Sequence, residues 1–148
     1  KLRVYIDTSV VGGCYDREYE KESRLLFAMA SRGQISLLVS ELLAEELEMA
    51  PEKVRNVLTS IPEASMEVVS LSEEAAVLRD AYLAASVVGP EHGYDAYHVA
   101  LATVARADII VSWNFRHIVH FDKIRGFNAE NLRNGYLPID IRSPLEVV

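Results

Sequence analysis

The sequence predicts an α/β domain with a mainly parallel sheet of five strands and helices on both of its faces. Short runs rich in β-branched and aromatic residues alternate along the chain with longer segments whose apolar residues recur at helical spacing. This alternation favours a parallel sheet between two layers of helices. The 148 residues are enough for one hydrophobic core, so we predict a single domain over residues 1–148.

Five segments are predicted as strands because they are short, apolar and rich in β-branched residues. They are residues 3–6, 35–39, 66–70, 108–112 and 136–141. Helical periodicity or helix-start signals predict helices between them, over residues 18–32, 41–50, 51–60, 72–87 and 95–105. Residues 10–16 are interpreted as a loop or short helix, 116–125 as weakly helical and 128–134 as a loop.

Composition indicates an ordinary globular protein, with half of the residues apolar and a quarter charged. No apolar run approaches the length of a membrane span, so we expect no membrane association. The single Cys14 excludes an internal disulfide and fits a reducing cytosol, which predicts a cytoplasmic location. The net charge of −7 argues against binding of nucleic acid by bulk electrostatics, but it is compatible with acids at a metal site.

Asp7 stands where the first predicted strand ends, and Thr8 and Ser9 follow it. Ligands of α/β sheets bind just beyond the carboxyl ends of the strands, so an acid at this place is a candidate metal ligand. Asp7 can equally cap the next helix, and the residues alone leave both roles open.

Glu46 falls inside the apolar stripe of its predicted helix, four residues after Leu42 and three after Leu43. An inward-facing acid is costly unless something pairs with it. Glu45 falls on the opposite, solvated side of the helix. Glu46 is therefore the candidate site residue, and Glu45 or a buried ion pair is the alternative.

Asp95 begins the most apolar predicted helix, as a cap, a site residue or both, and Asn114 follows the fourth strand. If the first and fourth strands are neighbours, Asp7 and Asn114 meet above the sheet, although asparagine also favours turns. Clustered acids repel one another, so they persist only with a cation among them or with shifted pKa values. Hard oxygen donors suit Mg²⁺ or Mn²⁺, and such an ion can activate water and clamp a scissile phosphate.

Four motifs, in order along the chain, resemble those of the PIN domain family. They are Tyr-Ile-Asp-Thr-Ser (5–9), Ser-Glu-Leu-Leu-Ala-Glu-Glu-Leu (40–47), Tyr-Asp-Ala-Tyr-His-Val-Ala-Leu-Ala (94–102) and Ala-Asp-Ile-Ile-Val-Ser-Trp-Asn-Phe (107–115). Within that family, the chain is similar to the VapC-like toxin ribonucleases of type II toxin–antitoxin pairs. The resemblance implies a three-layer α/β/α fold and cleavage of single-stranded RNA that depends on Mg²⁺ or Mn²⁺. It also implies a small antitoxin partner and a homodimer.

The resemblance carries over Asp7, Glu46 and Asp95 as metal-binding and catalytic acids. The family often has a fourth aspartate where this chain has Asn114, so a second metal ion is less well balanced here. Asn114 still offers a neutral oxygen and is kept as a catalytic candidate. Two hydroxyl residues are predicted to support the site, Thr8 and Ser112, the latter by holding a metal-bound water or a nearby acid.

A basic cluster follows Asn114. It consists of Arg116, His117, His120, Lys123, Arg125 and Arg133. A solvated face is the plain interpretation of such a cluster. Its place next to the predicted site makes Arg116, His117 and Lys123 candidates for contact with RNA phosphates.

Four further residues are given mainly structural interpretations. Trp113 and Phe115 could stack on a base, but core packing is the favoured role for both. His98 is predicted to be a packed, hydrogen-bonded histidine, and Asp108 a structural residue at the end of its strand away from the site.

The residues leave two other functions as alternatives. A PIN module with a weak or inactive site could bind RNA or a protein partner; Asn114 favours this alternative and the three acids oppose it. A phosphatase with Asp7 as nucleophile is disfavoured, because haloacid-dehalogenase-like enzymes have a second aspartate two residues later, where this chain has Ser9.

Overall fold

The computed structural model describes all 148 residues and contains one five-stranded sheet in the order β3-β2-β1-β4-β5. The strands are β1 (Leu2–Ile6), β2 (Ile35–Ser40), β3 (Met66–Val69), β4 (Ile109–Val111) and β5 (Asp140–Arg142). Every neighbouring pair runs parallel, and β1 lies at the centre between β2 and β4. The predicted α/β class, parallel sheet and strand number are confirmed.

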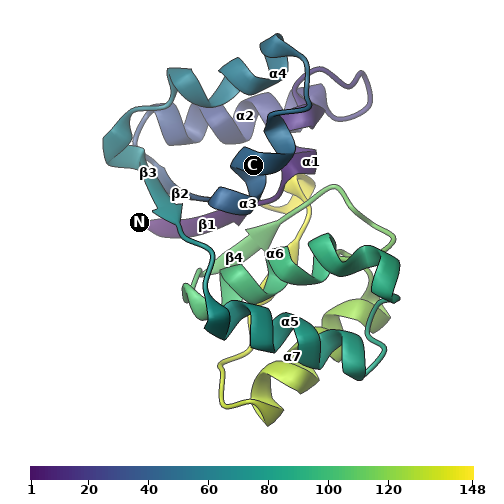
Figure 1. Ribbon diagram of the computed structural model, residues 1–148. Coiled ribbons are helices and arrows are strands. Elements are labelled where there is room, and N and C mark those ends of the chain that lie inside the picture. Colours follow the sequence, from purple (N-terminus) through teal and green to yellow (C-terminus); the bar gives the residue numbers. More distant parts are fainter.

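Seven α-helices connect and cover the strands. They are α1 (Thr8–Gly13), α2 (Glu20–Ser31), α3 (Glu41–Leu47), α4 (Glu52–Arg55), α5 (Glu73–Ala84), α6 (Gly93–Val104) and α7 (Phe121–Arg133). Figure 1 shows α1 to α4 on one side of the sheet and α5, α6 and α7, coloured from teal to yellow-green, on the other. The fold is therefore a three-layer α/β/α sandwich.

The two faces of the sheet carry two separate hydrophobic cores. Successive side chains of a strand point to opposite faces. Accordingly Val4 and Ile6 of β1 join the core beneath α1 to α4, whereas Tyr5 joins the core beneath α5 to α7. Burial on both faces explains why these strands are continuously apolar rather than alternating. No helix is both long and apolar enough to cross a membrane.

The predicted start of α6 was wrong. The helix begins at Gly93, and the preceding residue, His92, makes no capping hydrogen bond with its side chain. Asp95 therefore lies within the first helical turn rather than at the cap. Its charge still faces the favourable positive end of the helix dipole.

The predicted loop over residues 128–134 was also wrong, because α7 continues through Arg133. Its asparagines suggested turns, but Asn131 is fully buried, and hydrogen bonds from Tyr82 and to Thr103 satisfy its amide. Tertiary contacts thus overrule a weak local preference. The last strand is correspondingly shorter than predicted and covers only Asp140–Arg142.

Candidate active site

The carboxyl ends of β1 and β4 lie side by side, which meets the condition under which Asp7 and Asn114 were expected to come together. The backbone registers Ile6 opposite Val111, so the residues that follow each strand emerge at the same edge of the sheet. The Ser112 hydroxyl donates a 2.6 Å hydrogen bond to Oδ2 of Asp7 across this junction. The site is therefore built around the ends of two neighbouring strands.

Asp7 is a helix cap and a buried carboxylate at once. Its Oδ1 accepts hydrogen bonds from the Ser9 backbone N–H at 3.1 Å and from the Ser9 hydroxyl at 2.6 Å, and only 4% of the residue is exposed. Burial raises the pKa of Asp7, and the negative charge of Asp95 adds to this; the charge on His98 and the serine hydrogen bonds oppose it. A carboxylate buried among neutral donors beside a second acid is an environment that a cation would stabilise.

Ser9 takes a larger part in this arrangement than the sequence indicated. Besides donating to Asp7, its hydroxyl accepts a 2.9 Å hydrogen bond from the backbone N–H of Trp113. It therefore links the start of α1 to the segment after β4. The local signal was a hydroxyl residue two positions after an aspartate, which favours a side chain-to-backbone turn but does not reveal the distant partner.

Glu46 lies near the end of α3, half-buried, with Oε1 facing two donors. The Thr8 hydroxyl donates to Oε1 at 2.9 Å, and Nε2 of His98 lies 2.6 Å from the same atom. Partial burial by itself raises the pKa of Glu46, but the hydrogen bond and charge of His98, with help from Thr8, outweigh it and hold the pKa below its usual value. The neighbouring Glu45 is exposed, in line with the predicted orientation of the helix.

His98 is buried and hydrogen-bonded through both ring nitrogens, which confirms the predicted packed histidine. Its Nδ1 lies 2.7 Å from the Tyr5 hydroxyl, and the two rings meet edge to face. A continuous hydrogen-bonded chain thus runs from Tyr5 in the central strand through His98 to Glu46. The sequence did not identify either partner of the imidazole.

Asp95 lies one helical turn before His98, so both side chains project from the same face of α6. Nδ1 of His92 lies 3.8 Å from Oδ2 of Asp95, and the His92 ring stacks on His117 with 3.5 Å between ring centroids. Asp95 is only partly buried, unlike Asp7, and lies next to the His92 imidazole.

Asn114 forms a turn. Its Oδ1 accepts hydrogen bonds from the backbone N–H groups of Arg116 at 3.2 Å and His117 at 2.9 Å. Its own N–H donates to the Ser112 hydroxyl at 2.9 Å. The structure therefore shows the turn-forming role for Asn114, with its side-chain oxygen engaged by the backbone.

The two aromatic residues beside Asn114 have different environments. Trp113 is buried, stacks on Tyr19 with 4.2 Å between centroids, and donates a 2.8 Å hydrogen bond to the Ser23 hydroxyl. Core packing is thus the role of Trp113. Phe115 is 43% exposed, so the predicted packing role does not hold for it, and its ring is accessible beside exposed Arg116.

The acids form two hydrogen-bonded groups at the site. Asp7 is grouped with Ser9 and Ser112, and Glu46 with Thr8 and His98. No set of three or more Asp, Glu, His or Cys side chains is placed to hold a metal ion by itself. The carboxylate oxygens of Asp7, Glu46 and Asp95 are nevertheless hard donors of the kind that a divalent ion such as Mg²⁺ prefers.

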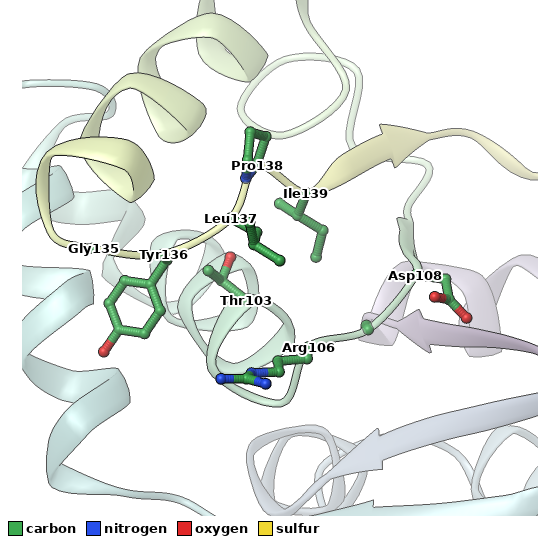
Figure 2. Close-up of a pocket in the computed structure, with 9 residues that line it drawn as sticks. Thr103, Arg106, Asp108, Gly135, Tyr136, Leu137, Pro138 and Ile139 are labelled. Atoms are coloured by element: carbon green, nitrogen blue, oxygen red, sulfur yellow. The ribbon is translucent and has the colours of Figure 1, made fainter.

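Of two hollows in the surface, one adjoins the site and the other does not. One of about 460 Å³ opens beside Ser9, Gly13, Trp113 and Asn114. Another of about 380 Å³ lies between the end of α6 and the segment Gly135–Ile139 (Figure 2). The second lies at the amino end of β4, where Oδ2 of Asp108 accepts a 2.7 Å hydrogen bond from the Arg3 backbone, so it is separate from the site and Asp108 is structural as predicted.

Comparisons with known proteins agree with this architecture. A family model described as PIN domain matches residues 3–116. A search of curated proteins finds no match. Among solved structures, the crystal structure of VapBC2 from Rickettsia felis, bound to a DNA fragment from their promoter, has a similar fold; its TM-score is 0.56 at 11% identity, over 96% of this chain and 98% of that chain. The family model covers most of the chain, which therefore belongs to the PIN domain family.

Proposed function

We propose that this protein is a metal-dependent endoribonuclease that hydrolyses phosphodiester bonds of single-stranded RNA. The observation that carries the proposal is the buried Asp7 carboxylate at the carboxyl end of β1, fixed by Ser9 and Ser112 and influenced by the charge of Asp95. PIN domains are generally nucleases, so membership of the family supports hydrolysis of this kind of bond.

Asp7, Glu46 and Asp95 are the proposed ligands of Mg²⁺ or Mn²⁺. When bound, such an ion supplies Lewis acidity that lowers the pKa of water and offsets charge on the scissile phosphate. Hydrogen bonds from Ser9 and Ser112 orient the Asp7 carboxylate and oppose the rise of its pKa on burial, while Thr8 supports Glu46. The protein's part is to hold these oxygens in place before substrate arrives.

The segment after β4 is the proposed RNA contact. Arg116 is exposed, His117 stacks on His92 close to Asp95, and Lys123 follows in the first turn of α7. Exposed Phe115 offers a face on which an unpaired base can stack. With a net charge of −7, contact with RNA depends on this local group rather than on the whole surface.

We further propose that the chain is the toxin of a type II toxin–antitoxin pair, cytoplasmic and homodimeric, with a small antitoxin as partner. The support is the similarity of fold to VapBC2 together with the PIN family membership. Copurification with the product of a neighbouring gene, followed by mass determination of the complex, tests this part.

The test of the nuclease is cleavage of a mixed single-stranded RNA pool with Mn²⁺, Mg²⁺ or EDTA. We expect cleavage with either ion, none with EDTA, and loss of at least about 100-fold in Glu46→Gln and in Asp7→Asn. Glu45→Gln is the matched control, because it makes the same change one residue away on the exposed side of α3. Equal activity in all variants would show that a contaminating nuclease cuts the RNA.

A second candidate function is a catalytically weak PIN module that binds RNA or a protein partner. The engagement of Asn114 Oδ1 by the backbone favours it, because this oxygen serves a turn. RNA binding by the folded, antitoxin-free protein without any metal-dependent cleavage would establish the module.

A further inference from the structure

Both hydrogen bonds to the Glu46 carboxylate fall on the same oxygen. The Thr8 hydroxyl and Nε2 of His98 both approach Oε1, at 2.9 and 2.6 Å, and Oε2 receives neither. The carboxylate is therefore held by one oxygen and leaves the other available for a further ligand.

His98 is held from both sides. A carboxylate oxygen can only accept a hydrogen bond, so Nε2 of His98 donates to Oε1 of Glu46, and Nδ1 lies 2.7 Å from the Tyr5 hydroxyl on the far side of the ring. Tyr5 is completely buried in the central strand, and His98 is 2% exposed on α6, so neither ring is free to turn. The contact with Tyr5 therefore fixes the position of the His98 Nε2 donor relative to the central strand β1.

We propose that His98 is a positioning residue, which holds Oε1 of Glu46 so that Oε2 is presented to the cation of the site. This inference rests on the proposed function, since it assigns Glu46 as a ligand. His98 does not touch the ion or the RNA. Groups that hydrogen-bond a ligating side chain orient it and make it a better donor, and their loss weakens metal binding.

The same imidazole couples two of the acids. His98 and Asp95 share a face of α6 one turn apart, and Glu46 comes from α3 in the opposite layer. The bond from His98 to Glu46 therefore fixes a side chain of α3 relative to the helix that carries Asp95.

The test is Mn²⁺ affinity, measured by titration calorimetry on the full chain without RNA. We expect His98→Leu to bind Mn²⁺ about 10- to 100-fold more weakly than the unaltered protein, because it removes the donor to Oε1. His98→Gln keeps an amide N–H of similar reach, and we expect it to recover most of this loss, to within about fivefold. If His98 only filled space, the leucine and glutamine variants would bind Mn²⁺ with equal affinity.

If His98→Leu does not fold, the double variant Tyr5→Phe/His98→Leu takes its place in the test. It removes both partners of the buried hydrogen bond, so no buried polar group is left without a partner. Thermal unfolding establishes which variants are folded. Unchanged Mn²⁺ affinity in folded His98→Leu or the double variant, alongside a loss in Asp7→Asn, would overturn the role of His98 and leave the metal site standing. Absence of Mn²⁺ binding by the unaltered protein would overturn both.

Discussion

The hydroxyl of Ser112 donates a 2.6 Å hydrogen bond to Oδ2 of Asp7, although the two residues lie 105 positions apart in the chain. The same hydroxyl accepts the backbone N–H of Asn114 at 2.9 Å. One side chain therefore joins the end of β1, the end of β4 and the turn that follows it.

Ser112→Ala should destabilise the fold and raise the pKa of Asp7 further. The substitution leaves Oδ2 buried without its donor, which we expect to cost about 1–3 kcal/mol in the free energy of unfolding. Urea unfolding at neutral pH measures this. Ser60→Ala is the control, since its hydroxyl is exposed and its loss should change stability by less than about 0.5 kcal/mol; similar losses for the two variants would contradict a special role for Ser112.

Asp7→Asn should stabilise the protein at neutral pH in EDTA. The pKa of Asp7 in the folded state lies above its ordinary value of 3.8, so folding becomes less favourable as pH rises from that value through the folded pKa. The amide removes this penalty, and we expect a gain on the order of 1 kcal/mol that disappears toward low pH. Urea unfolding of both proteins between pH 4 and pH 8 measures this difference. If Asp7→Asn is less stable than the parent at neutral pH, the pKa of Asp7 is not raised in the folded protein.

Gly13→Ala should destabilise the protein by about 1–3 kcal/mol through overpacking. A Cβ at this position would meet the Ser23 hydroxyl and come within 2.8 Å of Nε1 of Trp113, the two atoms that hydrogen-bond to each other. Gly12→Ala is the matched control one residue earlier in α1, where a Cβ meets nothing within 4 Å. Thermal unfolding should separate the two variants, and equal melting temperatures would disprove the close packing at Gly13.

Asn131→Ala should cost about 2–3 kcal/mol, because it leaves buried hydroxyls of Tyr82 and Thr103 without their amide partner. Arg133→Ala, on the exposed side of the same helix, should have little effect. Chemical denaturation compares them. Equal and small losses would show that α7 does not depend on this buried network.

Asn114→Asp should keep the turn and strengthen metal binding. A carboxylate oxygen can accept the same two N–H groups from Arg116 and His117, while the added charge favours a cation at the edge of the site. We expect tighter binding of Mn²⁺, or a second bound ion, by calorimetry, and faster RNA cleavage. Asn134→Asp, far along the chain at the end of α7, controls for the general effect of one more negative charge; an equal response in both would remove Asn114 from the site.

Local spacing determined the features that the sequence predicted correctly. Three predictions follow from the period of a strand or helix, which a few neighbouring residues fix. They are the α/β fold class, the place of Asp7 after β1 and the inward orientation of Glu46 on its helix. The structure bears these out, and it also shows that Ser40 caps α3, since its hydroxyl accepts the N–H of Leu43. The interpretation of Asn128 to Asn134 as a loop failed because turn propensity is weak compared with the burial of Phe127 and Asn131.

Only the tertiary structure decided which polar groups meet. His98 is 52 residues from Glu46 and 93 from Tyr5, and nothing near it in the chain specifies either partner. By itself the sequence determined a parallel α/β domain with Asp7 at the end of its first strand and Glu46 and Asp95 on helices. Packing of α3 and α6 against the central strand determined the contacts of those acids, because hydrogen-bond partners of buried groups are selected by three-dimensional proximity and not by spacing along the chain.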